Sequence, residues 1–167
     1  MDKIIIWCNL NSEQDALKKQ FGEYCVSIQG STLPDEKIRL EKLWRTGEVP
    51  ILISKPSVFG FGMNWQHCHH EIFVGLSDSF EEYYQAVRRC WRFGQTKPVN
   101  VYVVTADREG AVVANIERKE KDFNSMLTGM ISATQELCIE NIQGTKRDEA
   151  EYNPKEKMVI PKWMFGT

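Results

Sequence analysis

Residues 50–76 read PILISKPSVFGFGMNWQHCHHEIFVGL, which is a short apolar run, a long loop and a second apolar run. The runs 50–54 and 71–76 have the length and the β-branched content of buried strands. A segment of helical period precedes them at residues 35–46, and another follows at residues 80–93. Strands that are connected through helices, rather than through tight hairpins, pair in parallel. This stretch and its flanks therefore predict a parallel sheet.

The same alternation continues in both directions along the chain. The remaining expected elements are strands at 4–8, 24–28 and 99–105, and helices at 12–21, opened by a capping box at Ser12, and 109–127. We therefore predict an α/β fold in which helices cover both faces of a parallel sheet. In such sheets functional residues collect in the loops beyond the carboxyl ends of the strands, and the loop 55–70 is the longest of these.

Composition narrows the class of protein. The 167 residues are enough for one domain with a buried core, and 42% apolar with 26% charged residues excludes a disordered chain. No apolar run approaches the 18 or so residues of a membrane span, so we expect no membrane association. The formal net charge is −2, so a nucleic-acid contact needs a local basic patch. The alternation of strand-like and helical segments ends near residue 141. We therefore predict one domain over 1–140 and a loosely ordered tail or connector over 141–167.

Residues 85–95 read QAVRRCWRFGQ and carry the strongest chemical signal. On a helix, Gln85, Arg89 and Arg92 share one narrow face, with Arg88 at its edge. No acidic residue lies between positions 83 and 106 to neutralise these guanidinium groups. A guanidinium binds phosphate through two parallel hydrogen bonds, so this face suits a polyphosphate, although a solvated basic helix face is the alternative. The opposite side carries the residues expected to pack against the sheet: Tyr83, Val87, Cys90 and Trp91.

The loop after the strand 50–54 carries a second, weaker signal. Gly60 and Gly62 allow the backbone to approach a phosphate closely, and Ser54 and Asn64 can donate hydrogen bonds to one. A Gly-x-Gly turn after a strand is common, so this segment taken alone favours an ordinary loop. The 167 residues contain no Gly-x-x-x-x-Gly-Lys-Ser/Thr phosphate-binding loop.

In this order and spacing the two segments resemble motifs of superfamily-two helicases, most closely of the Swi/Snf-type DNA-dependent ATPases. GFGMNW at 60–65 is similar to motif V, and QAxxRxxRxGQ at 85–95, followed by Lys97-Pro98-Val99, is similar to motif VI. Residues 4–9 with the next helix are similar to motif IV. The resemblance covers about residues 2–127 and points to the second, C-terminal RecA-like domain of such enzymes.

The resemblance implies half of an ATP-hydrolysing DNA helicase or translocase. In that family ATP lies between two RecA-like lobes, and the N-terminal lobe supplies the Walker motifs and holds Mg²⁺. Arg92 then matches the arginine finger and Arg89 the second phosphate-contacting arginine, which makes them the expected catalytic residues. The implied ATP-binding residues are Gln85, Arg89, Arg92, Gly62 and Asn64, and the implied nucleic-acid-binding residues are Ser54, Gly60 and Trp65. The expected partners are an N-terminal lobe and duplex DNA, and this chain alone is expected to hydrolyse no ATP.

The chain also departs from the family pattern. Phe59 stands where many relatives have glycine, Arg88 where aspartate or glycine is usual, and Trp91 where histidine is common. These departures concern the fine geometry of the motifs and not the family. A stand-alone nucleic-acid-binding or regulatory module without ATP hydrolysis is the alternative function. The compact lobe without large insertions favours the cytoplasm of a bacterial or phage-infected cell.

The run His67-Cys68-His69-His70 suggests a metal site at first sight. Residues that enter a strand alternate between its two sides, so only two of these four could converge, and we predict a polar loop without metal. The five cysteines form no Cys-x-x-Cys pair, which argues against a disulfide framework and fits a reducing compartment. Four of them lie on apolar stretches and are expected in the core: Cys8, Cys25, Cys90 and Cys138.

Overall fold

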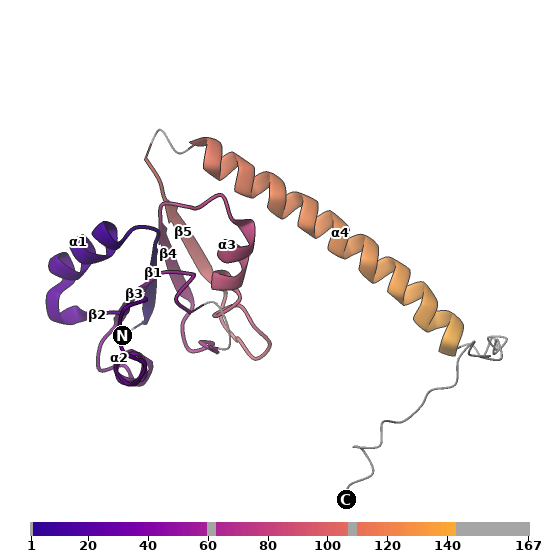
Figure 1. Ribbon diagram of the computed structural model, residues 1–167. Coiled ribbons are helices and arrows are strands. Elements are labelled where there is room, and N and C mark those ends of the chain that lie inside the picture. Colours follow the sequence, from indigo (N-terminus) through magenta and orange to yellow (C-terminus); the bar gives the residue numbers. More distant parts are fainter. Residues whose placement is uncertain (1, 60–62, 107–109, 143–167) are drawn as a thin grey trace, which may run out of the picture. The chain divides into compact units, whose positions relative to one another are not determined.

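A computed structural model describes residues 2–59, 63–106 and 110–142, and shows a five-stranded parallel sheet (Figure 1). The strand order is β2-β3-β1-β4-β5. The strands are β1 (Ile4–Cys8), β2 (Cys25–Ser27), β3 (Ile51–Ser54), β4 (His70–Val74) and β5 (Asn100–Val104). The helices are α1 (Asn11–Phe21), the 3₁₀ turn η1 (Gly22–Tyr24), α2 (Pro34–Thr46), α3 (Phe80–Val87) and α4 (Gly110–Ile142). The predicted α/β class with a parallel sheet is confirmed.

The central strand β1 shows why helices cover both faces of the sheet. Successive side chains of a strand point to opposite faces, and four apolar residues in a row therefore make both faces apolar. Ile5 and Trp7 join one buried cluster, to which α2 and α3 contribute. Ile6 and Cys8 join a second cluster, to which α1 contributes Leu17 and Phe21. The run IIIWC thus requires two helical layers.

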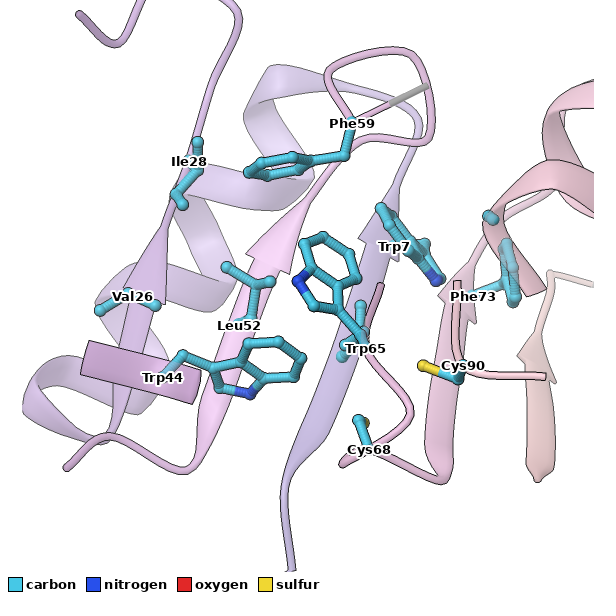
Figure 2. Packing of buried hydrophobic residues seen from close by; sticks show 12 residues of the cluster. Trp7, Val26, Ile28, Trp44, Leu52, Phe59, Trp65, Cys68, Phe73 and Cys90 are labelled. Atoms are coloured by element: carbon cyan, nitrogen blue, oxygen red, sulfur yellow. The ribbon is translucent and has the colours of Figure 1, made fainter. Parts of the chain in front are cut away.

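Aromatic side chains fill the cluster between the sheet, α2 and the loop that follows β3 (Figure 2). The Trp65 ring centre lies 5.3 Å from that of Trp44, 6.1 Å from that of Trp7 and 5.1 Å from that of Phe59. The Trp65 indole nitrogen donates a 3.0 Å hydrogen bond to the buried carboxylate of Glu41. The loop is therefore anchored in the core through Trp65.

Two helix ends show how far local signals determine the elements. Helix α2 has Pro34 at its start and ends at Gly47, whose φ of 90° is left-handed, which agrees with the helix predicted at residues 35–46. Helix α1 differs from the prediction, because Ser12 does not cap it. The Glu13 carboxylate instead accepts hydrogen bonds from the backbone nitrogens of Leu10 (2.9 Å) and Asn9 (3.0 Å).

The chain divides into two units, residues 1–124 and residues 125–167, and α4 contributes to both. In the first unit Phe123 packs against Tyr84, with ring centres 4.8 Å apart. The predicted helix 109–127 is thus confirmed but is longer than expected. Residues 143–167 lie outside the described residues, so the predicted boundary near residue 140 stays a prediction. Within the described residues no helix is both long and apolar enough to span a membrane.

Candidate functional site

The arginine-rich segment is held by a helix that ends earlier than its sequence period predicts. Ser79 caps α3 by accepting a 3.2 Å hydrogen bond from the backbone nitrogen of Glu82. The predicted helix 80–93 is wrong beyond Val87, because the chain continues there as successive tight turns. The first of these turns is closed by a 2.9 Å hydrogen bond from the backbone nitrogen of Arg89 to the carbonyl of Ala86. We call residues 88–95 the arginine turn.

The arginine turn and α3 together line an open cavity of about 460 Å³. The lining residues are Tyr84, Gln85, Arg88, Arg89 and Arg92. The structure therefore brings together Gln85, Arg89 and Arg92, which the sequence placed on one face, although turns rather than a continuous helix do so. Their role as ATP ligands stays a prediction.

Arg89 is the unusual cation of this group, because its residue is only 5% exposed. Burial first, and the neighbouring positive charge of Arg92 second, lower the pKa of the Arg89 guanidinium. Both causes disfavour the charged form, and an anion in the cavity would offset both. Arg88 and Arg92 are exposed and add positive charge at the cavity. The electrostatics of the site thus fit a phosphate-bearing ligand.

The chain segment that leads into β4 lies directly beside the arginine turn. It must return from the carboxyl end of β3 to the amino end of β4, because the two strands run parallel, and we call residues 63–69 the crossing segment. The backbone nitrogen of Trp65 donates to the carbonyl of Arg89 at 2.9 Å. The Arg92 guanidinium donates to the carbonyl of Met63 at 3.3 Å. A rearrangement of either segment would therefore be transmitted to the other.

Gln95 is a positioning residue that the sequence analysis did not single out. Its side-chain nitrogen donates to the carbonyls of Gln66 (2.9 Å), Cys68 (3.0 Å) and Cys90 (3.4 Å). One amide thus joins the crossing segment to the arginine turn. The signal was present in the sequence, because Gln95 closes the motif QAxxRxxRxGQ, but a glutamine next to a glycine does not by itself indicate a clamp.

A buried carboxyl group lies behind both segments. Glu71 in β4 is fully buried and accepts a 2.8 Å hydrogen bond from the indole nitrogen of Trp7. Burial raises the pKa of Glu71 to about 8, and the hydrogen bonds from Trp7 and Cys90 only partly oppose this shift. Figure 2 shows Cys68 and Cys90 close together in the same cluster, and their thiol groups interact. The protonated form of the Glu71 carboxyl group is therefore favoured at neutral pH.

The burial of three side chains differs from what their expected roles imply. Ser54 is fully buried and donates a 2.8 Å hydrogen bond to the carbonyl of Ile28, so its burial does not favour a contact with nucleic acid. Trp65 is only 1% exposed, so its burial does not favour stacking on a base. The nucleic-acid-binding roles of Ser54 and Trp65 stay predictions. Trp91, in contrast, was expected in the core and is 54% exposed, which corrects that expectation.

The remaining predicted loop residues have mixed outcomes. Asn64 is exposed and follows Met63, whose carbonyl receives the hydrogen bond from Arg92, but it is not among the residues that line the cavity. Gly60 and Gly62, predicted to contact nucleic acid and ATP respectively, lie outside the described residues. Cys8, Cys25 and Cys90 are buried as expected, together with Cys68. The side chain of Cys138 is not described.

The histidine run is divided between two environments. His67 packs against Trp44, with ring centres 4.9 Å apart. His69 and His70 lie near Asp2, with one potential ligand atom from each residue within 4.8 Å of the others. The Asp2 carboxylate lies 3.8 Å from the ammonium group of Lys97, which competes with any cation for it. The predicted absence of a metal site stays a prediction.

Comparison with known proteins gives the context for this geometry. The family model for the helicase conserved C-terminal domain matches residues 1–94. A crystal structure of the C-terminal part of the Fun30 ATPase domain is similar with a TM-score of 0.62 and 25% sequence identity over 69% of this chain. The chain corresponds to 39% of that protein's length. The C-terminal domain of the DEAD-box protein Dbp5 has a similar fold, with a TM-score of 0.56 and 20% identity over 73% of this chain and 72% of its own. Comparison with curated protein sequences gave no match.

Proposed function

The chain belongs to the helicase conserved C-terminal domain family, and we propose that it is the C-terminal lobe of an ATP-dependent, Swi/Snf-type DNA translocase. One observation carries this proposal: Gln85, Arg89 and Arg92 line a single cavity whose charge suits a polyphosphate. The stand-alone module without hydrolysis is the second candidate, and the resemblance of residues 85–95 to motif VI favours the translocase over it.

The chemistry we propose for this lobe is electrostatic. In phosphoryl transfer the transition state carries charge on the oxygens of the transferred group, and a positioned arginine stabilises that charge. Arg92 would supply this charge, and Arg89 would hold the phosphates in place. Gln85 would bridge the nucleotide and the opposing lobe. Because the Arg92 guanidinium is also hydrogen-bonded to the crossing segment, release of the phosphate would change the conformation of that segment.

The proposed site is completed by an N-terminal lobe. That lobe would carry the Walker motifs and hold Mg²⁺, since the 167 residues contain no Walker loop. Gly62 and Asn64 would contribute to ATP binding, and Gly60 would contact duplex DNA. We propose that the enzyme acts in the cytoplasm of a bacterial or phage-infected cell.

The test is ATP turnover by this chain joined to its N-terminal lobe, with and without duplex DNA. We expect DNA-stimulated hydrolysis by the pair and none by the chain alone. Arg92→Ala should lower turnover by about 10³-fold or more, the scale of a lost arginine finger. Arg92→Lys should not restore it, because an ammonium group cannot form the planar two-pronged contact. The thermal melting curve should be unchanged, since Arg92 is exposed.

Normal turnover by the Arg92→Ala enzyme would remove the catalytic role of Arg92. If neither the two-lobed protein nor the chain alone hydrolyses ATP, and the chain alone binds DNA, the module without hydrolysis is favoured. An early thermal transition of the Arg92→Ala protein would show that this arginine is structural. A suitable control for folding damage is Val87→Asp, which places an unpaired carboxylate against the core cluster and should lower the melting temperature.

A further inference from the structure

Arg88 and Trp91 form an exposed cation–aromatic pair next to the cavity that contains Arg89 and Arg92. The guanidinium carbon of Arg88 lies 5.1 Å from the ring centre of Trp91 and 6.0 Å from that of Tyr84. Tyr84 and Arg88 line the cavity, and Trp91 is connected to it through Arg88. We call Tyr84, Arg88 and Trp91 the stacking row. It places aromatic surface directly beside positive charge.

The exposure of Trp91 contrasts with that of the other described tryptophans. Trp7, Trp44 and Trp65 are at most 1% exposed, whereas Trp91 is 54% exposed although it follows the fully buried Cys90. An indole ring left in water forgoes a large hydrophobic stabilisation. Arg88 covers part of the ring, and the remaining surface is available to a second planar group. Part of the Trp91 ring therefore lies in solvent, where a ligand could reach it.

We propose that the stacking row binds the base of the same nucleotide whose phosphates contact Arg89 and Arg92. The inference rests on the proposed function, and it adds that this lobe recognises the base as well as the charge. A nucleoside triphosphate carries both groups on one molecule, a planar base and a polyphosphate.

The single cavity favours a nucleotide over the bases of a nucleic-acid strand. Two members of the stacking row and the two phosphate-directed arginines line the same space of about 460 Å³, within the range of small-molecule pockets. Stacking on indole and guanidinium faces is available to every base. The row should therefore favour nucleotides over bare polyphosphate without distinguishing one base from another.

The experiment is calorimetric titration of the full 167-residue chain with ATP and, separately, with inorganic tripolyphosphate, up to millimolar ligand and without magnesium. We expect ATP to bind roughly tenfold more tightly, the scale of one base–aromatic stack. Trp91→Ala should abolish this preference and leave tripolyphosphate affinity unchanged. Trp91→Phe should retain most of the preference, because it keeps a ring. Phe93→Ala is the matched control, since the Phe93 residue is fully exposed two positions away and should change neither affinity.

The outcomes separate the two proposals. Equal affinity of the wild-type chain for ATP and tripolyphosphate overturns the stacking row and leaves the phosphate site intact. Binding of neither ligand overturns both. If Phe93→Ala lowers ATP affinity as much as Trp91→Ala, exposed aromatic surface in general is responsible and the row is wrong. If Trp91→Ala weakens the binding of single-stranded oligothymidylate but not the binding of ATP, the stacking row is a nucleic-acid-binding surface and the inference fails.

Discussion

The crossing segment and the arginine turn are joined by a backbone hydrogen bond, yet the tryptophan of each segment lies in a different environment. The crossing segment, residues 63–69, places Trp65 and Cys68 in the core. The arginine turn, residues 88–95, leaves Trp91 and the guanidinium of Arg92 in solvent. The first segment therefore fixes the position of the second, and the second provides the groups that can meet a ligand. The residue type alone does not show whether a tryptophan anchors a segment in the core or lies in solvent where a ligand can reach it.

The largest effect that would test this contrast is on stability. Trp65→Ala should lower the free energy of unfolding by about 3–5 kcal/mol, because it removes a buried ring that contacts three other aromatic residues. Trp91→Ala should change it by no more than about 0.5 kcal/mol, as expected for a surface position. Denaturant unfolding of both variants measures the difference. Comparable losses in the two proteins would contradict the division of tasks.

Much of the fold could be predicted because its signals are local. The apolar runs at β1 and β3 indicate buried strands, and Pro34 and Gly47 mark the two ends of α2. The end of α3 could not be predicted in this way, because residues 88–93 keep a helical period of apolar and charged side chains. Tertiary hydrogen bonds determine the conformation of the chain after Val87, such as the bond from the backbone nitrogen of Trp65 to the carbonyl of Arg89.

The candidate site was partly predictable for a related reason. Gln85, Arg89 and Arg92 still meet, because successive tight turns after Val87 keep residues three and four positions apart on one side, as a helix does. The burial of Ser54 and Trp65 could not be predicted, since it depends on partners distant in sequence: the carbonyl of Ile28 for the hydroxyl, and the aromatic cluster for the indole. Local pattern carries no information on such contacts.

A second, smaller effect should appear in the pH dependence of stability, at the point where the two segments meet. Glu71 lies near both Cys68 and Cys90, and burial raises its pKa to about 8. The folded protein thus holds a proton that the unfolded chain releases above its ordinary pKa of about 4.3. The contribution of Glu71 to the free energy of unfolding is therefore complete below about pH 4.3. It falls as the pH rises from there to the folded-state pKa of about 8, by at most about 1.4 kcal/mol per pH unit, and then levels off.

Glu71→Gln should remove this dependence, because the amide imitates the protonated carboxyl and does not ionise. Unfolding measured from pH 5 to pH 9 should then be flatter than for the wild-type protein. Glu81→Gln, in the exposed first turn of α3, is the control and should keep the wild-type slope. An unchanged slope for Glu71→Gln would mean that Glu71 ionises in the folded protein without cost.

The smallest effect concerns Gly94 of the arginine turn, which lies beside Gln66 of the crossing segment. Its φ of 94° is left-handed, and a Cβ atom there would lie 3.1 Å from the side-chain nitrogen of Gln66, which donates to the carbonyl of Phe93. Gly94→Ala should therefore cost about 1–2 kcal/mol of stability through backbone strain, and the displaced Gln66 amide should add a loss of ATP turnover in the two-lobed enzyme. Gly30→Ala is the matched control, because Gly30 has no left-handed φ and no atom within 4 Å of the new Cβ. If Gly94→Ala and Gly30→Ala have the same melting temperature and the same rate of ATP turnover, the contact between Gly94 and Gln66 does not position the arginine turn.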